Sequence, residues 1–156
     1  MTSFFPSAEE TRLIDVSEEK LGSKLKKHIK PINEISFDPD SKDFLFNGIW
    51  SKDGFSISLK LKISNNFIPI IKGNFLNSDE GTLVQLTFEL FPATKRLLMF
   101  WTILTLLITI FFIGLYKAWL YGVISFGFCL VNYILSVENF KIQVRKSKRM
   151  LDKMLS

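Results

Sequence analysis

The sequence contains one cysteine and one histidine among its 156 residues. A single cysteine, Cys129, excludes a framework of internal disulfides and any metal site built on spaced cysteines. A single histidine, His28, cannot form a histidine cluster, and nothing in the sequence pairs it with a serine as a catalytic triad. Cys129 also lies in an apolar tract, where a thiol behaves as a small, inert hydrophobic group.

The sequence also lacks a phosphate-binding loop, because its eight glycines are scattered along the chain. Asp38, Asp40 and Asp43 share one acidic stretch, but an EF-hand starting at Asp38 would need glycine and glutamate where Asp43 and Ile49 stand. We therefore expect a solvated loop there, no metal, no cofactor and no enzymatic activity. The N-terminus lacks the basic and apolar regions of a cleavable signal peptide, so none is expected.

Charge is unevenly distributed along the chain. Residues 1–96 carry equal numbers of basic and acidic residues, and residues 97–137 carry only Lys117. The net charge of +5 therefore comes from Lys117 and from a basic segment at residues 138–156. A balanced N-terminal part argues against nucleic-acid binding, which normally requires a basic face. A basic segment directly after an apolar tract is typical of a juxtamembrane arm.

Residues 97–116 and 118–137 contain no charged residue. A helix of about 20 residues crosses the hydrocarbon core of a bilayer, which is about 30 Å thick. The whole tract is twice as long as one crossing needs, so a single helix would leave an apolar half in water. The sequence predicts a transmembrane hairpin over residues 95–137, with Lys117 at its turn. The alternative is a helical hairpin in the core of a soluble protein.

Aromatic and basic residues predict the orientation of this hairpin. Aromatic side chains are enriched where membrane helices meet water, and basic residues are enriched on the cytoplasmic side. We expect the interface residues to be Trp101, Tyr116, Lys117, Trp119 and Tyr121. Lys95, Arg96 and the basic segment flank the other end, which predicts a multi-pass plasma-membrane protein with both termini in the cytoplasm.

Small and polar residues form one stripe on each predicted membrane helix, at spacings of three and four. The stripes consist of Thr102, Thr105 and Thr109, and of Gly122, Ser125, Cys129, Asn132 and Ser136. If the chain folds back near Lys117, facing residue numbers sum to about 234, which pairs Thr109 with Ser125. Membrane helices associate through such residues. The stripes are expected to hold the hairpin together, and the alternative is that Asn132 lines a conducting or oligomeric interface.

The N-terminal 94 residues have the pattern of a small cytoplasmic α+β domain. A helix is predicted over residues 17–30, and strands over 43–50, 55–63, 67–76 and 82–90, with 11–15 as a candidate fifth strand. We expect a four- to five-stranded antiparallel meander covered by one packed helix. Pro69 suggests an edge strand or a bulge. Lys60 and Lys62 point away from the apolar face and, with the edge at Pro69, form the expected partner surface.

Residues 138–156 predict a basic C-terminal helix. Phe140, Val144 and Leu151 give it a loose apolar side, which is typical of a helix lying along an anionic membrane surface. A coiled-coil arm is the alternative. The residues expected to contact anionic lipid are Lys141, Arg145, Lys146, Lys148 and Arg149.

Turn and core positions of the chain carry a family resemblance. They are Phe46-x-Gly48-Ile49, Phe55-x-Ile57, Phe67-x-Pro69-x-Ile71-x-Gly73, Gly81-Thr82 and Pro92. Over residues 43–137 the chain resembles a group of small, uncharacterised bacterial membrane proteins, in which a β-rich domain precedes a hydrophobic hairpin. The resemblance implies a bacterial inner-membrane protein, and it implies no reaction and no functional residues.

Three functions remain open. The first is a membrane-anchored, non-enzymatic binding or scaffold module that recognises another protein or assembles with copies of itself. The second is a self-assembling membrane effector, an immunity protein or a phage-defence protein, in which the hairpin carries the function. The third is a sensor of anionic lipid. The lipid bilayer is the expected partner in all three, and nucleic acid is not expected.

Overall fold

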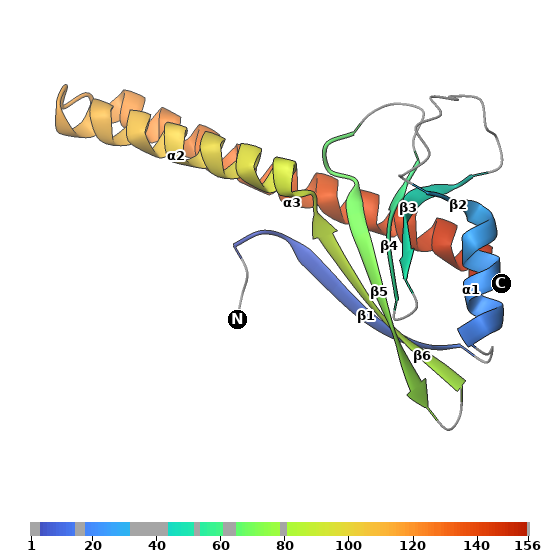
Figure 1. Ribbon diagram of the computed structural model, residues 1–156. Helices are drawn as coiled ribbons and strands as arrows, with labels where there is room; N and C mark the ends of the chain where they lie inside the picture. The colour runs from blue at the N-terminus through green and yellow to red at the C-terminus, as the bar shows by residue number, and fades with distance from the viewer. Residues whose placement is uncertain are drawn as a thin grey trace.

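The computed structural model describes residues 4–14, 18–31, 44–51, 54–60, 65–78 and 81–155. These residues form the strands β1 (Ser7–Ile14), β2 (Ile29–Pro31), β3 (Phe46–Ser51), β4 (Gly54–Leu59), β5 (Pro69–Ser78) and β6 (Gly81–Leu90). The helices are α1 (Glu18–His28), α2 (Pro92–Gly114) and α3 (Trp119–Leu155). The protein is therefore α+β, with an N-terminal sheet followed by two long apolar helices, as predicted (Figure 1). Lys62, Asp38, Asp40 and Asp43 lie outside the described residues.

The sheet is larger than predicted and mixed. The described strands form one six-stranded sheet in the order β1-β6-β5-β4-β3-β2. Strands β3 to β6 make the predicted antiparallel meander, and β1 extends it by pairing antiparallel with β6. The short β2 pairs parallel with β3, which a purely antiparallel meander does not allow. This pairing is possible because β2 follows α1 directly, and the helix carries the chain back along the sheet.

Strand β5 is central, so the prediction of an edge at Pro69 is wrong. Pro69 is the first residue of β5, is buried, and lies opposite Leu90 of β6. Proline has no backbone N–H, but the first residue of a strand tolerates this loss even inside a sheet. The outermost described strands are β1 and β2, and a partner surface at Pro69 is therefore not available.

Two helices, rather than the predicted one, cover the apolar face of the sheet. Leu21 and Leu25 of α1 are buried in the same core cluster as Phe140 and Leu151 of α3. In Figure 1 the C-terminal half of α3, drawn in red, crosses the sheet beside α1. The opposite side of the sheet, which we call the open face, has no described helix over it, and its strand residues Leu13, Ile49 and Leu76 are more than half exposed.

Aromatic side chains fill the part of the core beneath α1. The rings of Trp50, Phe55 and Phe75 lie 5.3–6.0 Å apart by their centroids. Phe55 lies over Gly73 of the neighbouring strand, where a Cβ atom would come within 2.3 Å of the ring. Glycine is therefore required at position 73 to seat the ring, since that approach is far below van der Waals contact.

The helices α2 and α3 leave the sheet side by side as a long arm (Figure 1). Lys117 lies in the turn between them with φ of 50°, a left-handed conformation that is uncommon for residues other than glycine. The predicted C-terminal helix is not a separate element, because α3 continues without a break from Trp119 to Leu155. Its apolar residues Phe140, Val144 and Leu151 pack in the core, so they are not free to enter a membrane surface.

Candidate functional site

The arm formed by α2 and residues 119–137 of α3, called the hairpin below, has the reverse of the burial found in a soluble protein. Its polar and small residues lie between the helices: Thr105, Thr109, Cys129 and Ser136 are only 5–8% exposed. Its large apolar residues point outward, for example Leu107, Ile110 and Leu120, which are 58–69% exposed. Both helices are long and apolar enough to cross a membrane. An exposed apolar surface of this extent marks a membrane or protein contact.

One interhelical hydrogen-bond cluster lies near the middle of the hairpin. Thr109 Oγ1 donates to Ser125 Oγ at 3.1 Å, and Ser125 Oγ lies 3.3 Å from the carbonyl oxygen of Thr105. Gly122 lets the helices approach closely, because a Cβ atom there would come within 2.4 Å of Ile113. The structure therefore brings Thr109 and Ser125 together across the predicted fold-back register.

Two further hydroxyls of the stripes, those of Thr102 and Ser136, bond within their own helices. Thr102 Oγ1 donates to the carbonyl oxygen of Leu98, and Ser136 Oγ donates to that of Asn132, each at 2.8 Å. The Asn132 side chain is partly exposed, and among the described residues it makes no hydrogen bond. Thr102 and Asn132, which the register predicts to face one another, are thus not joined by a hydrogen bond.

The predicted interface residues surround the turn of the hairpin. The side chains of Tyr116, Lys117, Trp119 and Tyr121 are exposed there, and the Tyr116 and Tyr121 rings contact phenylalanines of α2. Trp101 is also exposed, but it lies toward the other end of α2. The turn thus carries one cation and three aromatic side chains at the far end of the arm.

At the other end, α2 is fixed to the sheet by polar contacts. Thr94 Oγ1 donates to the carbonyl oxygen of Asn66 at 2.7 Å. Lys95 Nζ donates to Glu89 at 3.1 Å, and Lys72 donates to the same carboxylate at 3.3 Å. Lys95 and then Lys72 lower the pKa of Glu89 below its usual value. The first turn of α2 therefore cannot swing freely away from the end of β6.

A second group of charges fixes α3 to strand β1. Arg12 donates to Glu10 at 2.6 Å and also contacts Asp152 of α3. Lys148 of α3 forms an ion pair with Glu10 at 2.6 Å, and its ammonium lies 5.2 Å from the centre of the Phe88 ring. Arg12 and then Lys148 lower the pKa of Glu10. We call these four charged residues the β1–α3 clasp.

The clasp was not predicted from the sequence. Glu10 and Arg12 occupy inward positions of β1, where apolar residues would have predicted a strand from the sequence. Lys148, expected at the lipid surface, instead points to the sheet, whereas Lys141, Arg145, Lys146 and Arg149 are exposed. Lys60, expected on the partner surface, is half-buried at the end of β4. The sequence signal for this strand was the alternation of residues 8–14 between the two faces of the sheet. That signal is weak because both faces carry charged residues.

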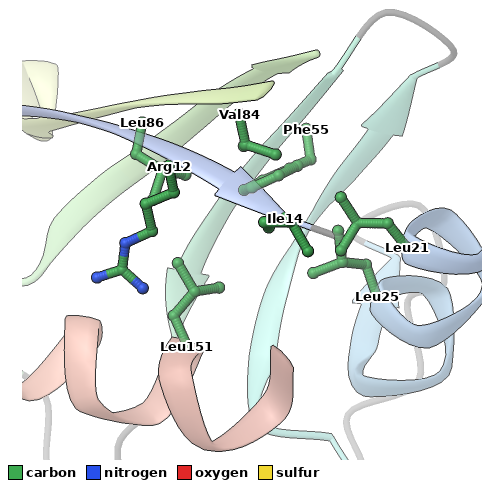
Figure 2. A pocket seen from close by; sticks show the side chains of 8 residues that line it. All are labelled: Arg12, Ile14, Leu21, Leu25, Phe55, Val84, Leu86 and Leu151. Atoms are coloured by element: carbon green, nitrogen blue, oxygen red, sulfur yellow. The ribbon is translucent and has the colours of Figure 1, made fainter. Parts of the chain in front are cut away.

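The junction groove lies where the start of β1 meets α3, just beyond the hairpin. Its volume is about 440 Å³, and it is lined by Pro6, Ser7, Ala8, Phe140, Lys141, Val144 and Arg145. It is far roomier than a hollow beneath the sheet that holds only about 10 Å³. That space, about one water molecule in size, is lined by Arg12 and apolar side chains of β1, α1 and α3 (Figure 2). It is a packing gap and cannot hold a ligand.

Within the described ranges, no three His, Cys, Asp or Glu side chains come together as a candidate metal site. The features that distinguish the molecule are the outward-facing apolar hairpin, its two attachments to the sheet, the open face and the junction groove. No family model, no curated protein and no solved structure matches the chain.

Proposed function

We propose that this protein is a membrane-anchored, non-enzymatic binding module, with its hairpin across the bacterial inner membrane. The observation that carries the proposal is the reversed burial of the hairpin, with threonine and serine inside and leucine, isoleucine and phenylalanine outside. In water such a surface would aggregate, whereas in a bilayer it meets lipid, and Thr109 and Ser125 bond across the helices inside it.

The same end of the hairpin carries both attachments to the sheet and nearly all of the nearby positive charge. Lys95 and Arg96 precede the apolar part of α2, and Lys141 and Arg145 follow that of α3. The far end carries only Lys117. By the positive-inside rule, the sheet and both termini are cytoplasmic.

A leucine strip on the open face, away from Ile49, is the surface that we assign to a partner protein. Leu13 lies opposite Leu83, which lies opposite Leu76, so three leucines form one apolar strip across β1, β6 and β5. Leu83 precedes Leu90, the last residue of β6, by seven residues, which is roughly 24 Å of strand. The strip therefore stands well away from the point where α2 begins, within reach of a cytoplasmic protein.

Replacing one leucine of the strip tests this function. Leu76→Asp should abolish recovery of a cross-linked partner from native membranes, because it places a charge in an apolar contact. Ile49→Asp is the matched control: Ile49 is 57% exposed and Leu76 is 51% exposed, and both lie on the open face. Resistance to a protease establishes that each variant is folded. If Leu76→Asp recovers as much of the same partner as Ile49→Asp does, or if the unmodified protein recovers none, the leucine strip is not a binding surface.

A second candidate function, a self-assembling membrane protein, is favoured by the Asn132 side chain. An amide at membrane depth needs a hydrogen-bond partner, and a second copy of the helix can supply one. Asn132→Leu should then convert an oligomer to a monomer in mild detergent, as measured by mass photometry. Asn139→Leu, at an exposed position two residues beyond the apolar tract, is the control. An unchanged mass distribution for Asn132→Leu would remove this candidate.

A further inference from the structure

The junction groove combines an apolar base with a cationic rim. Phe140 and Val144 are almost fully buried in the core and form its base, and Pro6 and Ala8 contribute the wall on the strand side. Lys141 and Arg145 stand four residues apart on α3, so their side chains leave the helix on the same side. A ligand suited to this groove has an anionic group beside an apolar segment.

The hairpin places the groove at the depth of lipid headgroups. The sum of 234 that relates Thr109 to Ser125 also sets Arg96 opposite Glu138, which marks one level along the arm. Lys141 lies about 4–5 Å beyond Glu138 along α3, and Arg145 about 10 Å beyond it. A headgroup layer spans roughly 5–8 Å on each side of the hydrocarbon core. Lys141 therefore lies within the headgroup layer, and the backbone of Arg145 lies about 2–5 Å beyond it, from where its long side chain can reach back to lipid phosphates.

Aromatic residues close the membrane side of this region. The Tyr133 hydroxyl donates to the backbone carbonyl oxygen of Phe4 at 2.7 Å, and the two rings are 5.5 Å apart. Phe4 also contacts Phe5, the residue just before the groove wall at Pro6. Tyrosine is typical of the region where membrane helices approach the interface, and these contacts hold the start of β1 against α3 where the groove opens.

Glu138 offsets the charge of the groove only in part. Lys141 pairs with Glu138 at 2.7 Å, but both side chains are more than half exposed, so the pair is weak. Arg145 makes no salt bridge or hydrogen bond to another described residue, but Lys141 and, at longer range, Arg145 lower the pKa of the Glu138 carboxylate. The Arg145 guanidinium can present several N–H donors to phosphate oxygens.

We propose that the junction groove binds the phosphate headgroup of an anionic phospholipid of the cytoplasmic leaflet. The phosphate lies between Lys141 and Arg145, and the glycerol lies against Pro6 and Ala8. This inference rests on the proposed membrane crossing and goes beyond a general attraction of basic residues to the membrane. It selects two of the exposed basic residues of α3 and leaves Lys146 and Arg149 without a role in lipid binding.

The test compares two pairs of charge-removing substitutions in the full-length protein. Lys141→Gln with Arg145→Gln alters the groove, and Lys146→Gln with Arg149→Gln removes the same charge from the same helix outside it. Native mass spectrometry counts the phosphatidylglycerol retained after extraction from vesicles of phosphatidylglycerol and phosphatidylcholine. Each Lys or Arg near an anionic surface strengthens binding about fivefold, so the groove pair should weaken retention about thirtyfold and the control pair far less.

A neutral substitution separates shape from charge. Ala8→Trp fills the groove without changing its charge, because Ala8 is a lining residue on the side of β1 that faces α3, and it should also reduce retention of phosphatidylglycerol. Equal losses in the groove and control pairs, or equal retention of the two lipids by the unmodified protein, would overturn the proposal. Displacement of the lipid by soluble glycerol phosphate alone would reassign the groove to a free phosphate ester. Extraction of the unmodified protein by alkaline carbonate would instead refute the membrane anchor itself.

Discussion

At the scale of single residues, two polar side chains are buried where α3 crosses the sheet. Ser147 is fully buried and Gln143 is nearly so, and neither Ser147 Oγ nor Gln143 Oε1 has a hydrogen-bond partner among the described residues. A buried polar group without a partner costs about 1–3 kcal/mol. These residues therefore hold α3 to the sheet less tightly than apolar residues of the same size would.

Ser147→Ala should accordingly raise the free energy of unfolding by about 1 kcal/mol, since it removes the unpaired hydroxyl and leaves a small apolar group. Thermal unfolding in detergent measures this change. Ser23→Ala, at an exposed position of α1, controls for the higher helix propensity of alanine. A lower unfolding temperature for Ser147→Ala than for the control would show that the hydroxyl is satisfied.

The clasp residue Glu10 should make the stability of the protein depend on pH. Its contacts with Arg12 and Lys148 lower its pKa below 4.5, so the unfolded chain takes up a proton before the folded protein does. The stabilisation is complete above about pH 4.5 and is lost as the pH falls through the lower pKa of the folded state. Glu10→Gln should therefore be less stable at neutral pH and lose less stability on acidification.

Urea unfolding between pH 3 and 7 measures this slope. Glu9→Gln removes a neighbouring carboxylate on the open face and is the control for net charge. An acid dependence of Glu10→Gln equal to that of the control would mean that the clasp does not stabilise the fold.

At the scale of helices and strands, the sequence predicts best where one requirement dominates. In residues 97–137 the absence of charge and the position of Lys117 suffice to predict two helices and their turn. In β4 and β6 the regular alternation of apolar and polar residues suffices to predict a strand with one buried face. The prediction of β1 as residues 11–15 missed the start of the strand, because Glu10 and Arg12 face inward. Their partners lie on α3, far away in the sequence, so the sequence does not reveal that these charges are paired.

The packing of α3 on the sheet could not be predicted because its pattern has two physical solutions. Phe140, Val144 and Leu151 form one apolar side, which satisfies either a membrane surface or a sheet. In the structure these residues pack beneath the sheet, which is the second of the two solutions. For the junction groove, the sequence indicates Lys141 and Arg145 as basic residues, but the wall supplied by residues 6–8 comes from tertiary contact.

Within the hairpin, Gly122 and Gly127 should respond differently to the same substitution. A Cβ atom at Gly122 would come within 2.4 Å of Ile113, whereas a Cβ atom at Gly127 meets nothing within 4 Å. Gly122→Leu should therefore destabilise the hairpin by about 1–3 kcal/mol through overpacking. Gly127→Leu should be neutral or stabilising, because leucine forms helices better than glycine. Unfolding in detergent compares the two, and equal stability of both variants would mean that the helices are not in close contact at Gly122.

At the scale of the whole molecule, α3 joins the hairpin and the sheet domain into one body. The helix carries the second apolar span and then supplies Phe140, Val144, Leu151 and Met154 to the core of the sheet. The helix has no break at residue 137, between its apolar span and the part that packs on the sheet. A displacement of the apolar span of α3 would therefore also move the side chains of α3 that pack beneath the sheet.

Phe140→Ala tests this continuity. Phe140 is 1% exposed and lies directly after the apolar span, so its truncation should destabilise the sheet domain by about 3–5 kcal/mol. Ile142→Ala is the control, because Ile142 is 39% exposed on the same helix. Limited proteolysis of membranes should cleave the sheet domain of Phe140→Ala rapidly, while alkaline carbonate still leaves the hairpin in the membrane. If Phe140→Ala resists the protease as well as Ile142→Ala does, the sheet domain folds without α3 and the hairpin is only a tether.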